Sequence, residues 1–379
     1  MKKIAAATII LLLSPFFSAH ASGITDTFTS LAKVYGLPLN KEVFCAYNSA
    51  GRIAGYNDSD SVRVIPASIS KLYTFDFALN TIGKNFRYTT DTFLDGTTLY
   101  LNGGGDPHFV IENLRSIVKK ISNERHITIS RFVFSPNFYF NWKTDPADVA
   151  SSITASLKED SGAPIDPNFS VNYSSVPYYG RGLKYQLQSA PLYMLIKQTN
   201  NWSNNLTADM MFEKAGGADA FTKYMQKTYG VNSSTIKFST GSGLSGNYTT
   251  CGLTIKVMKH LEYTAGSLSI GIFNIMSVPR VDPGVLDKAF PTIPDTLGIV
   301  AKSGSVDYHL NYAGIAYTST GPAYFAVFGG FSRLSDEPKA KMFDQVFIGS
   351  LLNRYKLLSF SYTPHNDVPG NARIVSASN

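Results

Sequence analysis

The spacing of apolar residues predicts helices in several parts of the chain. The clearest case begins near residue 68, where Leu72, Phe75 and Leu79 recur three or four positions apart and therefore share one helical face. Ile82 continues that face, and Gly83 ends the pattern, as glycine often does after a helix. The same spacing predicts further helices within residues 23–38, 109–122, 189–216 (interrupted by the polar run 200–205) and 339–355.

Alternating apolar and polar residues predict strands in other parts of the chain. Residues 86–107 alternate on both sides of Asp95-Gly96, a dipeptide typical of a two-residue hairpin turn. Further strands are predicted within residues 43–57, 127–135, 311–318 and 323–331.

The order of these elements divides the chain into two units. Strand-rich sequence with one helix, followed by irregular Pro- and Asn-rich sequence, separates two regions of helices and strands. We therefore expect an α+β fold in which residues 22–85 and 185–379 form one discontinuous domain, an antiparallel sheet with packed helices. Residues 86–184 are expected to form one small inserted α+β domain.

Residues 1–21 have the pattern of a secretory signal peptide. Two lysines precede an apolar run over residues 4–17, and Ala19-His20-Ala21 offers small residues at a cleavage site. No later segment has the roughly 18 unbroken apolar residues of a transmembrane helix. We therefore expect an exported protein without a transmembrane anchor.

Composition narrows the possible functions. The formal charge of +7 arises from 34 basic and 27 acidic residues without a basic run, which argues against a nucleic-acid-binding protein. The six histidines show no metal-binding spacing, so no metal site is expected. Cys45 and Cys251 either form one disulfide or stay free as small apolar residues, and the sequence leaves both alternatives open.

Ser68 and Lys71 are the first candidates for chemistry. Residues three apart share a helical face, so a lysine with a lowered pKa could take the proton from the serine hydroxyl and activate it as a nucleophile. The alternative is a capping serine beside a surface lysine, because the same Ser-x-x-Lys pattern also begins at residues 30 and 116.

Two further polar fragments could complete such a site. Residues 203–205 are Ser-Asn-Asn at the break between two predicted helices, and residues 302–305 are Lys-Ser-Gly-Ser on a predicted strand. Each has an ordinary structural interpretation, since Ser203 could cap a helix and Lys302 could guard the edge of a sheet. Chance rarely produces P-A-S-x-x-K, S-x-N and K-S-G in this order before a C-terminal strand.

This ordered set resembles the penicillin-recognising serine enzymes, whose signature combines S-x-x-K, S-D-N and K-T-G. Among them the chain is most similar to the D-Ala-D-Ala carboxypeptidase/endopeptidase family of penicillin-binding protein 4 type, peptidase family S13. The resemblance covers most of the chain and includes FRYTT, LNGGGDP, QSAPLYMLIKQTNNWSNN, GSGLSG and KSGSVDYHLNYAG. Ser303 and Asn204 depart from the usual Thr and Asp of these motifs, and Thr240 and Gly246 from the usual Asp and Arg.

The resemblance implies a β-lactamase/transpeptidase-like fold and four catalytic residues. Ser68 would attack the carbonyl of the penultimate D-Ala and become acylated, with Lys71 as its base. Ser203, helped by Lys302, would relay a proton toward the leaving amine.

The substrate-binding residues follow from the same resemblance. Asn205 would hold the substrate amide, Ser303 would bind the terminal carboxylate, and Gly304 would let its strand approach closely. Backbone N–H groups of Ser68 and Ser305 would form the oxyanion hole.

The implied function is a periplasmic serine DD-peptidase that cleaves D-Ala-D-Ala stem peptides or D-alanyl cross-links of peptidoglycan, needs no cofactor, and is acylated by β-lactam antibiotics. The alternatives are a β-lactamase or esterase on the same fold, and a non-catalytic wall-binding protein. Residues 241–246 also fit G-x-G-x-x-G, but no alternating parallel strands accompany them, so no dinucleotide site is expected.

Overall fold

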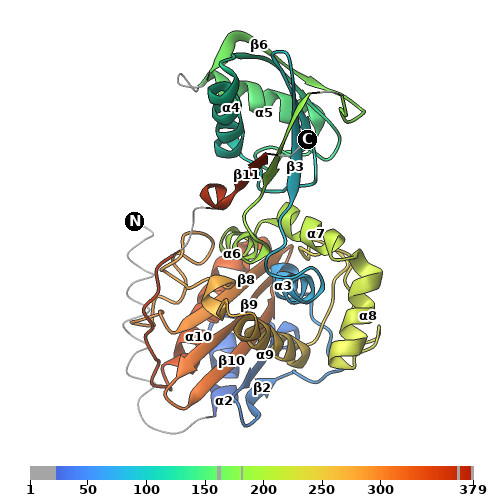
Figure 1. Cartoon of the computed structure of the whole chain (residues 1–379). Coiled ribbons are helices and arrows are strands. Elements are labelled where there is room, and N and C mark those ends of the chain that lie inside the picture. The colour runs from blue at the N-terminus through green and yellow to red at the C-terminus, as the bar shows by residue number, and fades with distance from the viewer. Residues whose placement is uncertain (1–22, 160–163, 181, 365–367, 377–379) are drawn as a thin grey trace.

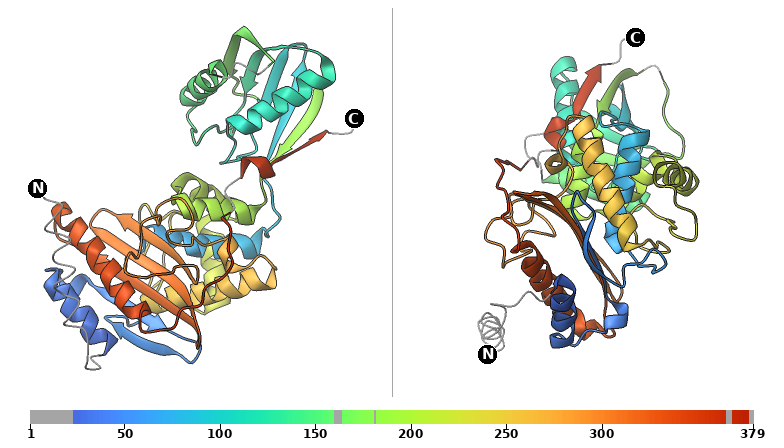
Figure 2. Two further views of the ribbon diagram at one scale, coloured as in Figure 1. Left: turned by 90° about the vertical axis from the view of Figure 1, so that its left-hand side faces the viewer. Right: turned by 90° about the horizontal axis from the view of Figure 1, so that it is seen from below.

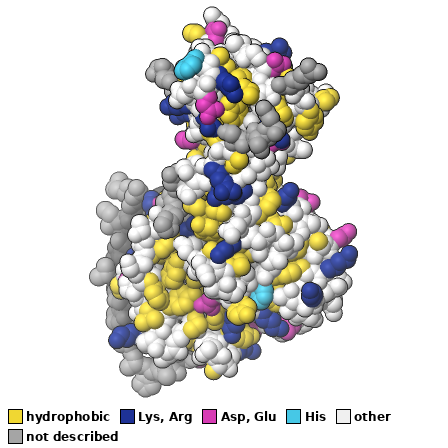
Figure 3. All heavy atoms as spheres, viewed as in Figure 1, with side chains coloured by type: hydrophobic (Ala, Val, Ile, Leu, Met, Phe, Trp, Pro, Cys, Tyr) yellow, Lys and Arg dark blue, Asp and Glu magenta, His cyan; other side chains and the backbone are white. Residues whose placement is uncertain are grey.

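The computed structural model describes residues 23–159, 164–180, 182–364 and 368–376, which form two lobes joined at a narrow waist (Figure 1). The signal peptide predicted for residues 1–21 lies outside the described residues. Within the described ranges, no helix has the length and apolar character needed to cross a membrane. On the face seen in Figure 3, basic and acidic side chains are interspersed, as the sequence suggested.

A five-stranded antiparallel sheet forms the centre of the larger lobe. In its order, β2-β1-β10-β9-β8, strand β1 from near the start of the chain pairs with β10 from its C-terminal part. Alternate residues of β1 face opposite sides, so that Phe44 joins one apolar core while Val43 and Cys45 join the other. The strands are β1 (Val43–Tyr47), β2 (Arg52–Tyr56), β8 (Ile299–Val306), β9 (His309–Thr318) and β10 (Gly321–Gly330).

Helices cover both faces of this sheet (Figure 2), which confirms the predicted α+β fold. Helices α2 and α10 pack on one face, where the ring centroids of Phe28 and Phe44 lie 4.5 Å apart. On the other face α9 packs on the sheet, and α3 lies among α6, α7 and α9, where every residue from Ser70 to Leu79 is buried. The helices of this lobe are α2 (Ile24–Val34), α3 (Ser70–Thr81), α6 (Leu192–Trp202), α7 (Asn205–Lys214), α8 (Gly217–Tyr229), α9 (Cys251–Ser267) and α10 (Glu337–Leu352).

Cys45 and Cys251 form a disulfide, which decides between the two alternatives that the sequence left open. It joins β1 to the first residue of α9, with the two Cα atoms 6.1 Å apart. The sheet and the helix layer above it are therefore linked covalently.

The smaller lobe contains a six-stranded mixed sheet with its own apolar core. The predicted hairpin is present, since Asp95 pairs with Thr98 across a turn in which Gly96 has φ +57°. The sheet order is β11-β7-β3-β4-β5-β6. Its elements are β3 (Thr89–Asp95), β4 (Thr98–Asn102), α4 (Ile111–Arg125), β5 (Ile129–Phe134), α5 (Pro146–Lys158), β6 (Ile165–Tyr173), β7 (Leu183–Gln188) and β11 (Arg373–Ser376).

The smaller lobe differs from the expectation in four places, one of which is strand β6 in the region expected to be irregular. A helix, α5, occupies part of the region expected to be irregular, because the Asp145 side chain accepts bonds from two backbone N–H groups and Pro146 fits the first turn. Strand β7 crosses the predicted boundary between residues 184 and 185. Strand β11, from the end of the chain, pairs with β7. The exact domain limits remain a prediction.

Candidate active site

The Ser68 hydroxyl and the Lys71 amine are in direct contact. Ser68 lies in the short 3₁₀ helix η3 (Ala67–Ile69), and Lys71 lies in the first turn of α3. The Lys71 Nζ donates to the Ser68 Oγ over 2.7 Å. Ala67 has a positive φ of 47°, an unusual conformation for alanine immediately before this serine. Lys71 is fully buried and no side chain caps α3, so the alternative of a capping serine and a surface lysine is wrong.

Lys71 is enclosed by hydrogen-bond acceptors, and its burial favours the neutral form. Its Nζ also lies 2.7 Å from the Asn205 Oδ1 and 3.1 Å from the Ser242 carbonyl oxygen. Burial lowers the pKa of Lys71 to about 7, and the negative charge of Asp209 opposes that shift. Near neutral pH, a large fraction of Lys71 can therefore accept a proton from the serine.

A second lysine–serine pair lies beside the first. The Lys302 Nζ donates to the Ser203 Oγ over 2.9 Å and to the Ser303 carbonyl oxygen over 2.8 Å. Ser203 follows α6 in a left-handed conformation with φ 53°. Lys302 is fully buried, so it is not an exposed edge-strand lysine. Burial, followed by the charge of Lys71, holds the pKa of Lys302 well below its usual value.

Strand β8 passes directly beside the turn that carries Ser68. A Cβ atom on Gly304 would lie 2.8 Å from the Pro66 carbonyl oxygen and 3.0 Å from the Ser68 nitrogen, so only glycine fits without displacement. Asn311, opposite Gly304 on β9, donates to the carbonyl oxygens of Ile65 and Pro66.

Strand β8 has backbone N–H groups on the edge that does not pair with β9. The Ala301 N–H bonds Ser277 rather than β9, so every second N–H from Ala301 onward points away from β9. By this alternation, the N–H groups of Ser303 and Ser305 lie along the free edge. The Ser303 side chain is half-buried and the Ser305 side chain is exposed.

The structure therefore brings six of the predicted site residues into contact or close approach, namely Ser68, Lys71, Ser203, Asn205, Lys302 and Gly304. Ser303 and Ser305 lie beside them on β8. The structure also adds Asp209 and Ser242, which sequence reasoning did not select. Asp209 accepts from the Ser242 N–H over 2.7 Å and from its hydroxyl over 3.0 Å, which holds the Ser242 carbonyl against Lys71. At Gly243, with φ +84°, a Cβ atom would lie 1.9 Å from the Ala67 carbonyl oxygen. Ser242 and Gly243 belong to the GSGLSG fragment (residues 241–246), one of the fragments on which the family resemblance rests, and Gly243 packs against the serine turn.

The Ser-x-x-Lys pairs that begin at residues 30 and 116 lie on the surface. Ser30 and Lys33 are exposed on α2, and Ser116 on α4 bonds its own helix at the Glu112 carbonyl. In the part of the chain that the structure describes, no three His, Cys, Asp or Glu side chains gather as a metal site would require.

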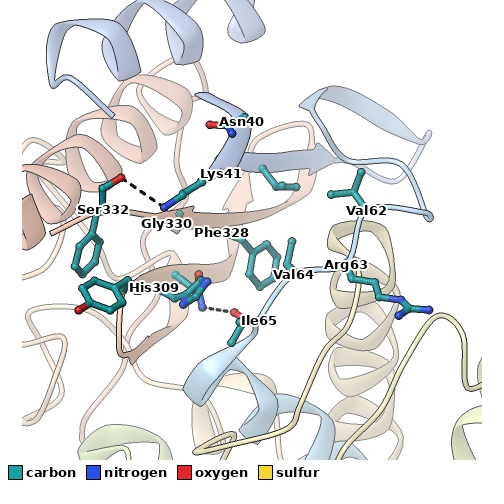
Figure 4. A pocket seen from close by; sticks show the side chains of 15 residues that line it. Asn40, Lys41, Val62, Arg63, Val64, Ile65, His309, Phe328, Gly330 and Ser332 are labelled. Carbon is teal, nitrogen blue, oxygen red and sulfur yellow. Dashed lines mark hydrogen bonds between the residues drawn. The ribbon is translucent and has the colours of Figure 1, made fainter. Parts of the chain in front are cut away.

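A separate cavity lies beside the residues that precede the serine turn. It has a volume of about 440 Å³ beside Arg63 and His309 (Figure 4), and the hydrogen bond to Ile65 drawn there is that of Asn311. None of the predicted site residues lines it, so we do not assign the substrate to this cavity.

An antiparallel sheet with packed helices, in which two buried lysines each bond a serine beside an open strand edge, is the arrangement of serine hydrolases with the β-lactamase/transpeptidase-like fold. The family profile described as "D-Ala-D-Ala carboxypeptidase 3 (S13) family" matches residues 47–131 and 140–343, so the chain belongs to this family. It is accordingly a serine-type DD-peptidase, a hydrolase. The family named from the sequence is confirmed.

Solved structures share the fold. The Bd3459 predatory endopeptidase from Bdellovibrio bacteriovorus, in one form, is 22% identical with a TM-score of 0.76, covering 88% of this chain and 99% of that chain. A penicillin G-acylated Bd3459 in complex with immunity protein Bd3460 is 24% identical with a TM-score of 0.72, covering 86% and 96%. Penicillin-binding protein 4 from Haemophilus influenzae is 16% identical with a TM-score of 0.65, covering 86% and 99%. A search of curated proteins gives no match.

Proposed function

We propose that Ser68 and Lys71 carry the peptidase reaction and that the enzyme works in the periplasm on peptidoglycan stem peptides. The observation that supports this most directly is the 2.7 Å contact between the Ser68 Oγ and the Nζ of a lysine whose pKa lies near 7. A lysine that is half neutral at working pH is suited to general-base catalysis.

The first step forms an acyl-enzyme. The Ser68 Oγ attacks the carbonyl carbon of the penultimate D-Ala while its proton moves to the Lys71 Nζ. The peptide C–N bond then breaks, and Ser203 gives its proton to the leaving amine. Ser203 recovers a proton through Lys302, its hydrogen-bond partner, and the proton that Lys71 took from Ser68 replaces the one that Lys302 gave, so that Lys71 is neutral again. Water attacks the ester in the second step, which releases the shortened stem and restores the Ser68 hydroxyl.

The free edge of β8 offers the substrate a binding strand. An extended stem peptide could bond the outward groups at Ser303 and Ser305, with its carbonyl oxygen between the N–H groups of Ser68 and Ser305. Asn205 would hold the substrate amide. The Ser303 hydroxyl and Lys302 would bind the terminal carboxylate, and Gly304 permits the close approach.

The same site would accept β-lactam antibiotics as acylating inhibitors. A penicillin presents a strained amide carbonyl and a nearby carboxylate, which match the groups proposed to receive the stem peptide. The fold is shared with a structure of Bd3459 in its penicillin G-acylated form, and that protein is described as a peptidoglycan endopeptidase. Cleavage of cross-links as well as terminal D-Ala is therefore part of the proposal.

Labelling with a fluorescent penicillin, followed by mass spectrometry of the acylated peptide, tests the assignment. We expect the adduct on Ser68, and no adduct on Ser68→Ala. Ser116→Ala is the matched control, because it removes a serine from the same Ser-x-x-Lys pattern on an exposed helix. An adduct that persists in Ser68→Ala, or that maps to another serine, would refute the proposal.

A further inference from the structure

A cleft beside the proposed catalytic groups contains the only two tryptophans of the chain. Trp202 is the last residue of α6, directly before Ser203, and its side chain is 57% exposed. Trp142 comes from the smaller lobe and is 43% exposed. Both line a cavity of about 340 Å³ together with His108, Gln198 and Asn204.

This cavity continues away from the catalytic groups. A second cavity, of about 500 Å³, shares His108, Trp142 and Gln198 with the first and extends to the start of α4. The combined cleft lies between α6 of the larger lobe and residues of the smaller lobe that include His108, Ile111 and Trp142. Helix α6 is seen next to the waist in Figure 1. Its size is in the range of ligand sites, roughly 300–1,000 Å³.

The backbone that presents Trp142 is strained. Asn141 and Trp142 both have positive φ, 48° and 60°, in a two-residue turn closed by mutual hydrogen bonds between Phe140 and Lys143. Glycine is preferred at the second position of such a turn. A tryptophan there costs stability, and such strain persists at sites where a side chain is needed.

The turn is also held firmly in place. Phe140 is fully buried, the Asn141 N–H bonds the Phe109 carbonyl, and the ring of Trp142 makes an edge contact with His108. His108 is fixed in turn by a 3.2 Å contact of its Nε2 with the Thr207 hydroxyl. The indole is therefore presented in a rigid position, which lowers the entropy cost of binding.

One side chain that lines the cleft has a polar atom without a partner in the described part of the chain. The Gln198 Oε1 is buried and makes no hydrogen bond there. A buried amide oxygen without a partner is costly. Rotation of the Gln198 side chain toward the cleft would let this oxygen accept a hydrogen bond from an O–H or N–H group of a ligand. The cleft is thus lined by two partly exposed indole side chains and by an amide whose oxygen has no partner among the described residues.

A sugar ring fits these groups better than the stem peptide does. Pyranose rings have apolar C–H faces that stack on indole, and their hydroxyl and N-acetyl groups donate hydrogen bonds. Stem peptides are small and polar and offer little surface for two indoles. We propose that the cleft binds an N-acetylated pyranose of the glycan strand that carries the stem peptide.

The dimensions are compatible with this assignment, which rests on the proposed DD-peptidase function. Gln198 lies five residues before Ser203, about 7.5 Å along the helix axis. Four extended residues span at most about 14 Å. A sugar joined to the stem a few residues before the scissile bond can therefore reach the cleft while the D-Ala carbonyl lies at Ser68.

Steady-state kinetics on two substrates test the inference. One is a disaccharide-linked pentapeptide ending in D-Ala-D-Ala, and the other is the same pentapeptide without sugar. We expect the ratio of kcat/KM for the two to be about tenfold in favour of the sugar. Trp142→Ala should bring the ratio close to one, whereas Tyr179→Ala, which removes an exposed aromatic side chain outside the cleft, should leave it unchanged.

The outcomes separate the two proposals. If the ratio of kcat/KM with and without sugar is one in the wild type, or is unchanged in Trp142→Ala, the sugar assignment is wrong. Release of D-Ala in the same experiment would still support the peptidase function. An equal loss on both substrates in Trp142→Ala would assign the cleft to the peptide instead. Titration with the disaccharide alone gives a direct check, because both tryptophans lie in the cleft and their fluorescence should change. Binding without turnover of either substrate would instead count against the peptidase mechanism.

Discussion

Replacing Asp209 by asparagine should shift the pH dependence of acylation toward acid. Asp209 is the charged group that raises the pKa of Lys71, against the larger lowering by burial. Asparagine removes the charge but keeps an oxygen to accept the Ser242 N–H, and its amide group can donate to the Ser242 hydroxyl. The substitution therefore changes the electrostatics at Lys71 with little change in the loop.

The expected size follows from the position of the Lys71 pKa. With a pKa of about 7, roughly one tenth of Lys71 is neutral at pH 6. Loss of a nearby negative charge lowers a lysine pKa by about 1 unit, which leaves about half neutral at the same pH. Acylation at pH 6 should rise about fivefold in Asp209→Asn. The plateau at high pH should fall modestly, because a weaker base transfers the proton less readily.

The assay is the rate of acylation by a fluorescent penicillin measured from about pH 5 to pH 9. Asp219→Asn, an exposed aspartate in the first turn of α8, is the matched control and should keep the wild-type profile. If the profile of Asp209→Asn moves toward alkaline pH or does not move, while the thermal unfolding curve stays normal, Lys71 is not the base that limits acylation.

Three other predictions concern strand β8 and the pH dependence of stability. Gly304→Ala should slow penicillin acylation at least about tenfold with an unchanged circular dichroism spectrum, because the new methyl group would push β8 from the serine turn; wild-type rates would contradict the close approach. Ser303→Thr should keep activity on a D-Ala-D-Ala peptide, while Ser303→Val should raise the barrier by roughly 1–3 kcal/mol in kcat/KM; equal activities would remove the hydroxyl from carboxylate binding. The hydrogen bond to Asp76 raises the pKa of His260, so this stabilisation is present at acid pH and is lost as the pH rises through the raised value. Urea unfolding should show that loss as the pH rises above the ordinary histidine pKa in the wild type and not in His260→Gln.

Much of the fold and of the site could be predicted from the sequence, because both depend on local patterns. Helical periodicity located α3, and alternation with Asp95-Gly96 located the first hairpin of the smaller lobe. The three short motifs contained the residues that meet around Ser68. What placed them together was the resemblance to a family, since the chain separates Lys71 from Lys302 by more than half its length.

Contacts between distant segments could not be predicted in this way. The four-residue strand β11 is too short to show alternation, and its partner β7 lies far away in the sequence. Asp209 and Asn311 resemble ordinary polar residues of a helix and a strand. They become important only because the fold places them against the Ser242 loop and the Pro66 carbonyl. The disulfide was undecided for the same reason.

The two buried lysines make the state of the base depend on the substrate. Neither Lys71 nor Lys302 has a salt bridge among the described residues, and the pKa of each is lowered mainly by burial. A substrate carboxylate arriving at Lys302 would favour its protonated form. The charge gained on Lys302 would then disfavour protonation of Lys71 through Coulomb repulsion. Ligands with a carboxylate, such as a stem peptide or a penicillin, should therefore promote the neutral Lys71 that their own acylation requires, whereas amidated peptides should acylate more slowly.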